Sequence, residues 1–288
     1  MSAQPLFGVR KLLKRVRQAA YVGAHPLPHR ACANVIRSSR LPFDFKTSLK
    51  YVGDHLALSL STSQRRDVLV AHYSTFPSFL RPPCLAELGQ GITIWEKFID
   101  DDLPYLRITL ERSKLAPMEG ELQLLFSFRT DLYVLTFSVG PGEVFGAESG
   151  TVLFIGGVQG RFASREEVRE AARLNSELSP RSLLVLAVQA LARAIDVDEI
   201  IAVGEDEQVS RAYAQSLISF DYAQFWKKLG GVRVGRHYRL PMESPQKPLA
   251  LVSASHRSRA RRRREIKNAI QESLDIRFRQ LIERRSEP

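Results

Sequence analysis

The fold is decided by residues 121–139, which read ELQLLFSFRTDLYVLTFSV. In the first half, every second residue is apolar, a period of two that predicts a strand with one buried face. These alternating residues are Leu122, Leu124, Phe126 and Phe128. Thr130 and Asp131 interrupt the pattern before a second β-branched and aromatic run, as in a tight hairpin. We therefore expect two antiparallel strands, at 121–129 and 131–139.

Similar runs flank this hairpin and extend it into a meander. Strands are expected at residues 91–98, 106–111 and 151–157, with turn residues between them. After Gly160 the period changes, and we expect helices at 164–176, 181–195, 208–217 and 221–229 and strands at 199–204 and 232–240. The pattern predicts an α+β (mixed α/β) fold, with a curved, mainly antiparallel central sheet flanked by helices.

Helical spacing also marks both ends of the chain. Residues 5–20 and 65–76 have apolar positions three or four apart, and residues 255–285 read as one amphipathic helix. We expect a basic helical N-terminal region at 1–83, a mixed α/β core domain at 84–254 and a basic amphipathic helix at 255–288.

Charge is distributed unevenly over the 288 residues, whose net charge is +11. Residues 1–66 hold twelve Lys or Arg against two acids, and residues 255–288 hold eleven against five. The part between them holds nineteen against twenty-four, so the charges are +10, −5 and +6 along the chain. Blocks of like charge indicate contact with a polyanion, such as an anionic lipid or a nucleic acid, or simply solvated ends.

Candidate contacts for an anionic membrane surface or another polyanion therefore lie in the two basic ends. They are Arg10, Lys11, Lys14, Arg15, Arg261, Arg262, Arg263 and Arg264. Stacking aromatics are absent from residues 257–264, which disfavours nucleic acid relative to a membrane or an acidic protein. A solvated helix face remains the alternative.

The two cysteines, Cys32 and Cys84, stand alone, which predicts no metal site and favours buried thiols over a disulfide. No apolar run reaches the roughly 18 residues that a spanning helix needs. No secretory signal is recognisable at the N-terminus. We expect a cytoplasmic protein without a transmembrane segment, either free in the cytoplasm or peripheral at the inner membrane.

Three residues are candidates for catalysis. Glu119 and Glu121 lie two apart at a strand start and so on one face, where they serve as a base, bind a cation or are simply solvated. His237, in the last strand, is either a general base or a core histidine. Ligand contact is expected at Gly156, Gly157, Gln159 and Gly160, with a strand bulge as the alternative.

Residues 225–236, FWKKLGGVRVGR, resemble the closing motif of N-acetyltransferase-like (GNAT) folds. The resemblance implies an acyltransferase with an acyl-CoA or acyl-carrier-protein donor. Two features depart from that family. A Gly-rich loop that would cradle pyrophosphate does not precede the 181–195 helix, and Trp226 stands where a tyrosine acid is usual.

Taken together, several segments are similar to the VirK/YbjX family of Gram-negative bacteria. They are residues 118–122 (MEGEL), 155–160 (IGGVQG), 178–184 (LSPRSLL), 221–226 (DYAQFW), 229–231 (LGG) and 261–264 (RRRR). This resemblance implies an accessory protein linked to virulence, to the cell envelope or to antimicrobial-peptide resistance, without implying catalytic residues. Two hypotheses follow, namely a binding protein and a divergent acyltransferase.

Overall fold

The computed structural model describes residues 16–41, 46–98, 106–148, 150–161, 164–213, 220–246 and 248–283. Its eight strands are β1 (Ile92–Lys97), β2 (Leu106–Arg112), β3 (Leu122–Phe128), β4 (Thr130–Pro141), β5 (Thr151–Gly160), β6 (Glu199–Ala202), β7 (Val232–Val234) and β8 (His237–Leu240). Its helices are a segment at 16–24, α2 (Pro26–Ser38), α3 (Thr62–Thr75), α4 (Pro82–Glu87), α5 (Arg165–Leu174), α6 (Pro180–Ala194), α7 (Val209–Tyr213), α8 (Tyr222–Lys228) and α9 (Arg257–Leu281). The expected α+β fold is confirmed.

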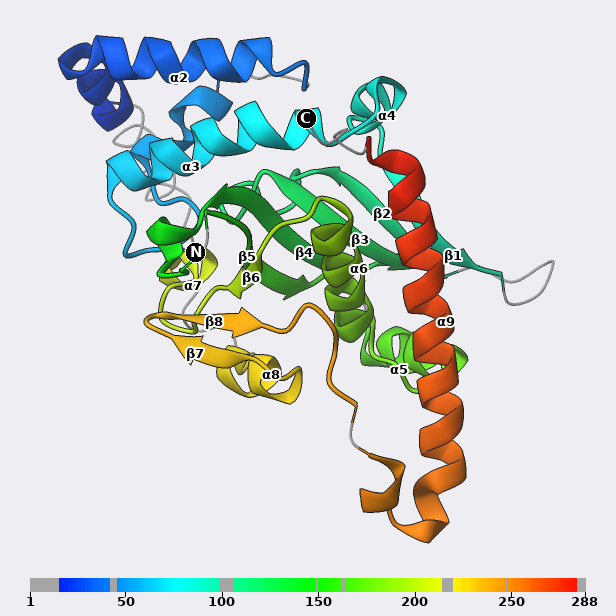
Figure 1. The fold of residues 1–288 in the computed structure, drawn as a ribbon. Coiled ribbons are helices and arrows are strands. Elements are labelled where there is room, and N and C mark those ends of the chain that lie inside the picture. The colour runs from blue at the N-terminus through cyan, green and yellow to red at the C-terminus, as the bar shows by residue number, and fades with distance from the viewer. Residues whose placement is uncertain are drawn as a thin grey trace, which may run out of the picture.

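All eight strands form one sheet in the order β1-β2-β3-β4-β5-β6-β8-β7 (Figure 1). The first five are a meander of antiparallel neighbours, as the alternation predicted. The β3–β4 hairpin turns at Arg129, whose φ is 57°. Strands β5 and β6 pair in parallel, because α5 and α6 carry the chain back across the sheet between them.

The expected single strand at 232–240 is wrong. Gly235, with φ of 57°, turns the chain, and residues 232–240 form a β7–β8 hairpin. The second arm, β8, is inserted next to β6, and β7 is left at the sheet edge. Strand β8 is mostly buried between β6 and β7. Strand β7 is mostly exposed, because it pairs with β8 alone.

Two helix starts follow from side-chain caps that the sequence indicated. Ser164 and Glu167 form a reciprocal capping box at α5. The Ser179 hydroxyl accepts from the Ser182 N–H at α6, and Pro180 takes the first helical position. From this start α6 runs as a largely buried helix between the sheet and α9 (Figure 1).

One apolar core unites the described parts of the chain, from Cys32 to Ile282. Helix α3 packs against β4, and the second half of α9 packs against α6 and β1. Both cysteines are buried and free. Among the described residues no helix is long and apolar enough to cross a membrane. The division at residues 83 and 254 stays a prediction, because residues of all three regions share this core.

Candidate functional site

Glu119 is buried in a polar cluster against β5. It is therefore not solvated at a strand edge, which was one of the expectations for this residue. Its carboxylate accepts hydrogen bonds from Gln159 Nε2 at 2.7 Å, the Ser210 N–H at 3.3 Å and Gln208 Nε2 at 3.4 Å. Burial raises the pKa of Glu119, and the hydrogen bonds oppose that rise. Since these donors come from β5 and from the segment at residues 208–210, the Glu119 carboxylate links two parts of the chain that are distant in the sequence.

Glu121 lies in a second, separate cluster. Both of its oxygens are 2.9 Å from Lys50 Nζ, and one accepts from the Tyr73 hydroxyl at 2.8 Å. His55 Nε2 lies 3.0 Å from the carboxylate. Burial alone would raise the pKa of Glu121, but the Lys50 charge and the His55 contact hold it well below its usual range. The expectation of two paired carboxylates on one face is therefore wrong, because the side chains join different clusters.

His237 lies in the core, on the side of β8 that packs against two aromatic rings. Its ring meets Phe154 edge-on at 5.3 Å and Phe145 at 6.1 Å between centroids. Burial lowers the pKa of His237 to about 4, so the ring is neutral at pH 7. The structure gives it an apolar packing environment.

The glycines at 156 and 157 allow a close approach, but the approaching group is the chain itself. A Cβ at Gly156 would lie 1.7 Å from the Glu119 carbonyl oxygen, and one at Gly157 would lie 2.1 Å from Glu119 Oε2. Gln159 donates to the same carboxylate. Gly160, at the end of β5, faces the Tyr133 ring. The proposed ligand contacts at this segment thus coincide with internal packing.

The junction between β5 and β6 is closed. Pairing between the two strands covers residues 152–155 and 199–202. Beyond it, the Tyr222 hydroxyl both accepts from the Val158 N–H at 2.9 Å and donates to the Val158 carbonyl at 2.8 Å. Trp226 Nε1 donates to the Val203 carbonyl at 2.9 Å. Both rings are buried, so described side chains fill the space beside the paired strands.

Of the candidate cations in the two basic ends, the structure describes those of the C-terminal end. Arg10, Lys11, Lys14 and Arg15 lie outside the described residues. Residues 249–264, named the basic arm from here on, comprise two 3₁₀ turns and the first turns of α9, and project from the body (Figure 1). Arg261, Arg262 and Arg263 are exposed on this arm, and Arg264 is half-buried.

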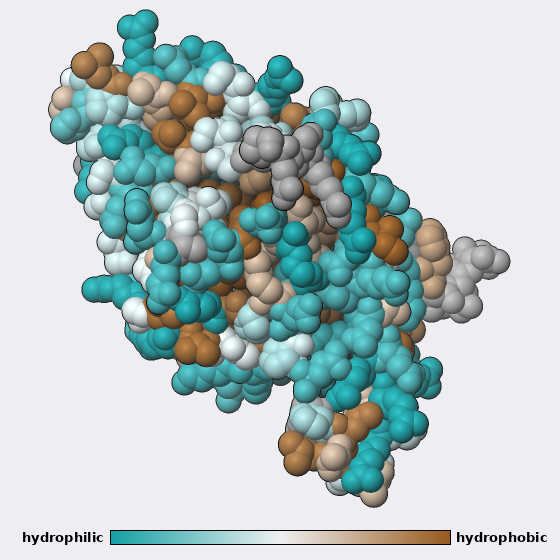
Figure 2. Space-filling view, viewed as in Figure 1, coloured by the Kyte–Doolittle hydropathy of each residue, from teal (hydrophilic) through white to brown (hydrophobic). Residues whose placement is uncertain are grey.

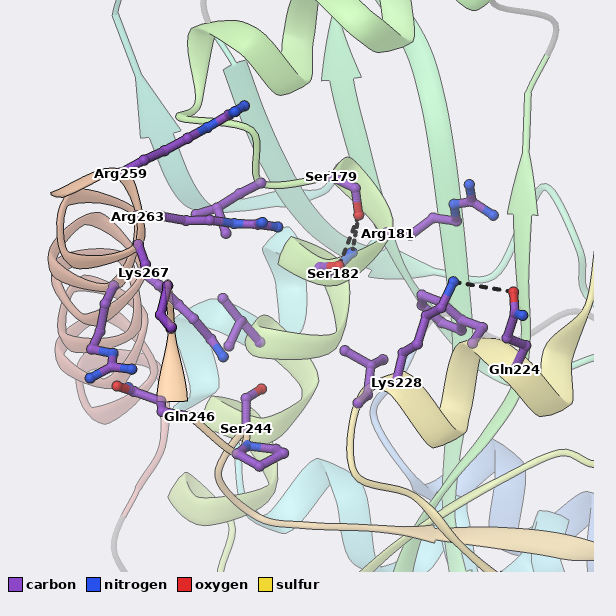
Figure 3. Close-up of a pocket in the computed structure, with 18 of the residues that line it drawn as sticks. Ser179, Arg181, Ser182, Gln224, Lys228, Ser244, Gln246, Arg259, Arg263 and Lys267 are labelled. Carbon is purple, nitrogen blue, oxygen red and sulfur yellow. Dashed lines mark hydrogen bonds between the residues drawn. The ribbon is translucent and has the colours of Figure 1, made fainter. Parts of the chain in front are cut away.

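A cavity of about 1110 Å³ opens between α6, α8 and α9, on the inner side of the basic arm (Figure 3). Among the residues that the structure describes, six cationic side chains line it, against one carboxylate, that of Asp221. The cations are Arg181, Lys228, Arg259, Arg263, Arg264 and Lys267. Sequence reasoning found only the α9 arginines of this set, because Arg181 and Lys228 stand singly in the chain and reach the cavity through the tertiary fold.

Comparison with known proteins places this chain in a family. A model of the family described as "Protein of unknown function (DUF535)" matches residues 44–275. The chain belongs to this family. It is 30% identical over 245 residues to "Uncharacterized protein YbjX" of Escherichia coli (strain K12), an alignment covering 78% of this chain and 70% of that protein.

A second relative is an "Uncharacterized protein" of Haemophilus influenzae, 28% identical over 158 residues, with 52% of this chain and 51% of that protein covered. No solved structure matches the chain. The VirK/YbjX resemblance is therefore confirmed, whereas the N-acetyltransferase-like resemblance stays a prediction. Neither relative's name states an activity.

Proposed function

We propose that this DUF535 member is a cytoplasmic binding protein that docks on the anionic surface of the inner membrane through its basic arm. The observation that carries the proposal is the tip of the arm. Leu251 is 65% exposed there, beside a helix start with six arginines. Figure 2 shows apolar residues gathered at this projecting end, next to hydrophilic ones.

The composition of the arm fits a lipid interface. Residues 249–264 contain six arginines and one histidine but no aspartate or glutamate. Each arginine near an anionic lipid surface contributes about 1 kcal/mol, and burying one leucine side chain contributes roughly 1.5–3 kcal/mol. These contributions support a reversible association that depends on anionic lipid and weakens with salt.

A membrane explains the arm better than a nucleic acid does. Arginines also bind the phosphate backbone of a nucleic acid. A nucleic acid, however, would offer the exposed leucine no favourable contact. Base stacking requires aromatic rings, and residues 249–264 contain none besides His256. An acidic protein partner would use the same arginines, and it becomes one outcome of the test.

The test is co-sedimentation of the full chain with vesicles of phosphatidylcholine alone or with about 30% phosphatidylglycerol. Binding is expected only with the anionic lipid. Arg261→Gln/Arg262→Gln and Leu251→Ser should each weaken it. Val232→Ser is the matched control, since Val232 is 66% exposed on β7, away from the arm. Equal binding by Leu251→Ser and Val232→Ser, or binding to duplex DNA instead of vesicles, would overturn the proposal.

The wider role that we propose is the accessory one implied by the VirK/YbjX resemblance, in virulence, the cell envelope or antimicrobial-peptide resistance. A strain lacking the gene should lose resistance to a cationic peptide. Wild-type protein should restore it and Leu251→Ser should not, if docking serves that role. Full rescue by Leu251→Ser would separate the phenotype from the membrane. The closed β5–β6 junction gives no support to the alternative, an acyltransferase.

A further inference from the structure

We propose that the cavity between α6, α8 and α9 binds the phosphate group of an organic phosphate with an apolar part, through Arg181, Arg263 and Lys267. This site is distinct from the outward surface of the basic arm, because its lining cations come from α6, α8 and α9, and Arg263 extends from α9 toward the start of α6 (Figure 3). The cavity combines an uncompensated charge, a fixed arginine and an apolar wall.

The positive charge of the cavity has little internal compensation. Within the described part of the chain, Arg181, Lys228, Arg263 and Lys267 form no ion pair with a carboxylate. The lining carboxylate of Asp221 caps α8 by accepting from the Gln224 N–H at 2.8 Å. Arg259 reaches Glu177 only at 3.9 Å. An anion entering the cavity would therefore meet unneutralised cations.

Arg181 is held in place by aromatic rings. Its guanidinium carbon lies 4.5 Å from the centroid of Phe220, 5.2 Å from Tyr133 and 5.9 Å from Phe225. Stacking of this kind fixes the guanidinium plane while leaving its N–H groups available to a ligand. A preorganised arginine loses little entropy on binding, which is the property that phosphate recognition uses.

Helix α9 supplies the opposite wall with cations on one face. Arg259, Arg263 and Lys267 are four residues apart and so follow one stripe of the helix. Burial, reinforced by the Arg263 charge, lowers the pKa of Lys267. These two like charges repel each other in the unliganded protein, and a phosphate between them would relieve that repulsion.

The start of α6 adds a favourable field. Ser179 and Ser182 lie at the cavity wall (Figure 3), at the positive end of a 15-residue helix dipole. Pro180 has no N–H, and the Ser182 N–H is already bound by Ser179. The helix therefore contributes its dipole, and the hydrogen bonds to the ligand come from the arginine and lysine side chains.

The size and the apolar wall of the cavity indicate more than a free phosphate ion. A volume of about 1110 Å³ is slightly above the roughly 300–1,000 Å³ of typical organic-ligand pockets and far larger than a phosphate ion requires. Apolar side chains share the lining with the cations, namely Leu178, Leu186, Phe220, Phe225, Leu229 and Val252. A nucleotide and the headgroup region of a phospholipid both combine a phosphate with an apolar part.

Titration calorimetry of the full chain at low salt tests the site with inorganic pyrophosphate, ADP and monomeric dihexanoyl phosphatidic acid. We expect saturable one-to-one binding of ADP or the short-chain lipid, displaced by pyrophosphate. Preference for one organic probe identifies the soluble or the lipid source. Arg263→Gln and Arg181→Gln should each weaken binding by about tenfold or more.

Arg262→Gln is the matched control, because it removes the same charge from the adjacent position of α9, outside the cavity lining. Its effect should stay below about threefold. Thermal melting of Arg181→Gln and Arg181→Lys shows whether a change at Arg181 disturbs folding. Arg263 is exposed, so Arg263→Gln tests the site independently of folding. The proposal fails if no probe binds with a Kd below about 10 mM, or if Arg262→Gln and Arg263→Gln act equally. Vesicles are absent from this assay, so its outcome is independent of membrane docking.

Discussion

The buried Lys50–Glu121 pair gives the sharpest stability prediction. In Glu121→Gln the uncharged amide can still accept from Tyr73, but Lys50, whose side chain is only 13% exposed, loses its counter-charge. Breaking a buried pair from one side costs about 3–5 kcal/mol. Lys50→Met should cost a similar amount, since it leaves a buried carboxylate.

A double-mutant cycle isolates the pair, because the double variant leaves neither charge alone. We expect Lys50→Met/Glu121→Gln to cost about 2–3 kcal/mol less than the sum of the single changes. The free energy of unfolding is measured by urea denaturation at pH 7, followed by far-ultraviolet circular dichroism.

The control is an exposed pair of equal distance. Arg129 and Glu170 are 2.9 Å apart, with side chains 43% and 31% exposed. Their cycle, through Arg129→Gln and Glu170→Gln, should give a coupling of about 0–1 kcal/mol, because solvent screens the charges. A Lys50–Glu121 coupling no larger than that of Arg129–Glu170 would refute the argument that burial strengthens the pair.

Two further predictions concern the packing around β5 and β8. Gly156→Ala should lower the free energy of unfolding by about 1–3 kcal/mol, because the added Cβ would lie 1.7 Å from the Glu119 carbonyl oxygen. The control is Gly150→Ala, whose Cβ would have no atom within 4 Å and which should change the free energy by no more than about 0.5 kcal/mol. Equal urea midpoints for the two variants would contradict this packing. His237 has its pKa lowered to about 4, so the unfolded state binds more protons between about pH 4 and 6.5. The free energy of unfolding should therefore fall as the pH is lowered through that window, and His237 accounts for up to about 3 kcal/mol of the loss. In His237→Phe the loss over the same window should be smaller. A pH profile unchanged by His237→Phe would show that another group dominates.

Much of the fold could be predicted because its signals are local. Alternation placed β3 beside β4, and the Ser164 and Ser179 caps fixed where α5 and α6 begin. The β7–β8 hairpin was missed, because a three-residue edge strand and a Gly turn leave little periodicity to detect.

The candidate sites were less accessible from the sequence. The pattern at Glu119 and Glu121 indicated a strand start, but it did not show that their partners lie elsewhere. Gln159 is 40 residues from Glu119, and Lys50 is 71 residues from Glu121. Burial of a carboxylate depends on such distant donors, so no local rule distinguishes it from a solvated one.

By itself the sequence determined the strand and helix pattern, the family and the basic character of both ends. These properties depend on the order of apolar, capping and charged residues along a short stretch of chain. Only the tertiary structure decided that Tyr222 closes the β5–β6 junction and that Arg181, Lys228 and the α9 cations surround one cavity. Those arrangements join segments far apart in the chain, and their energy comes from contacts that exist only after the sheet and helices pack.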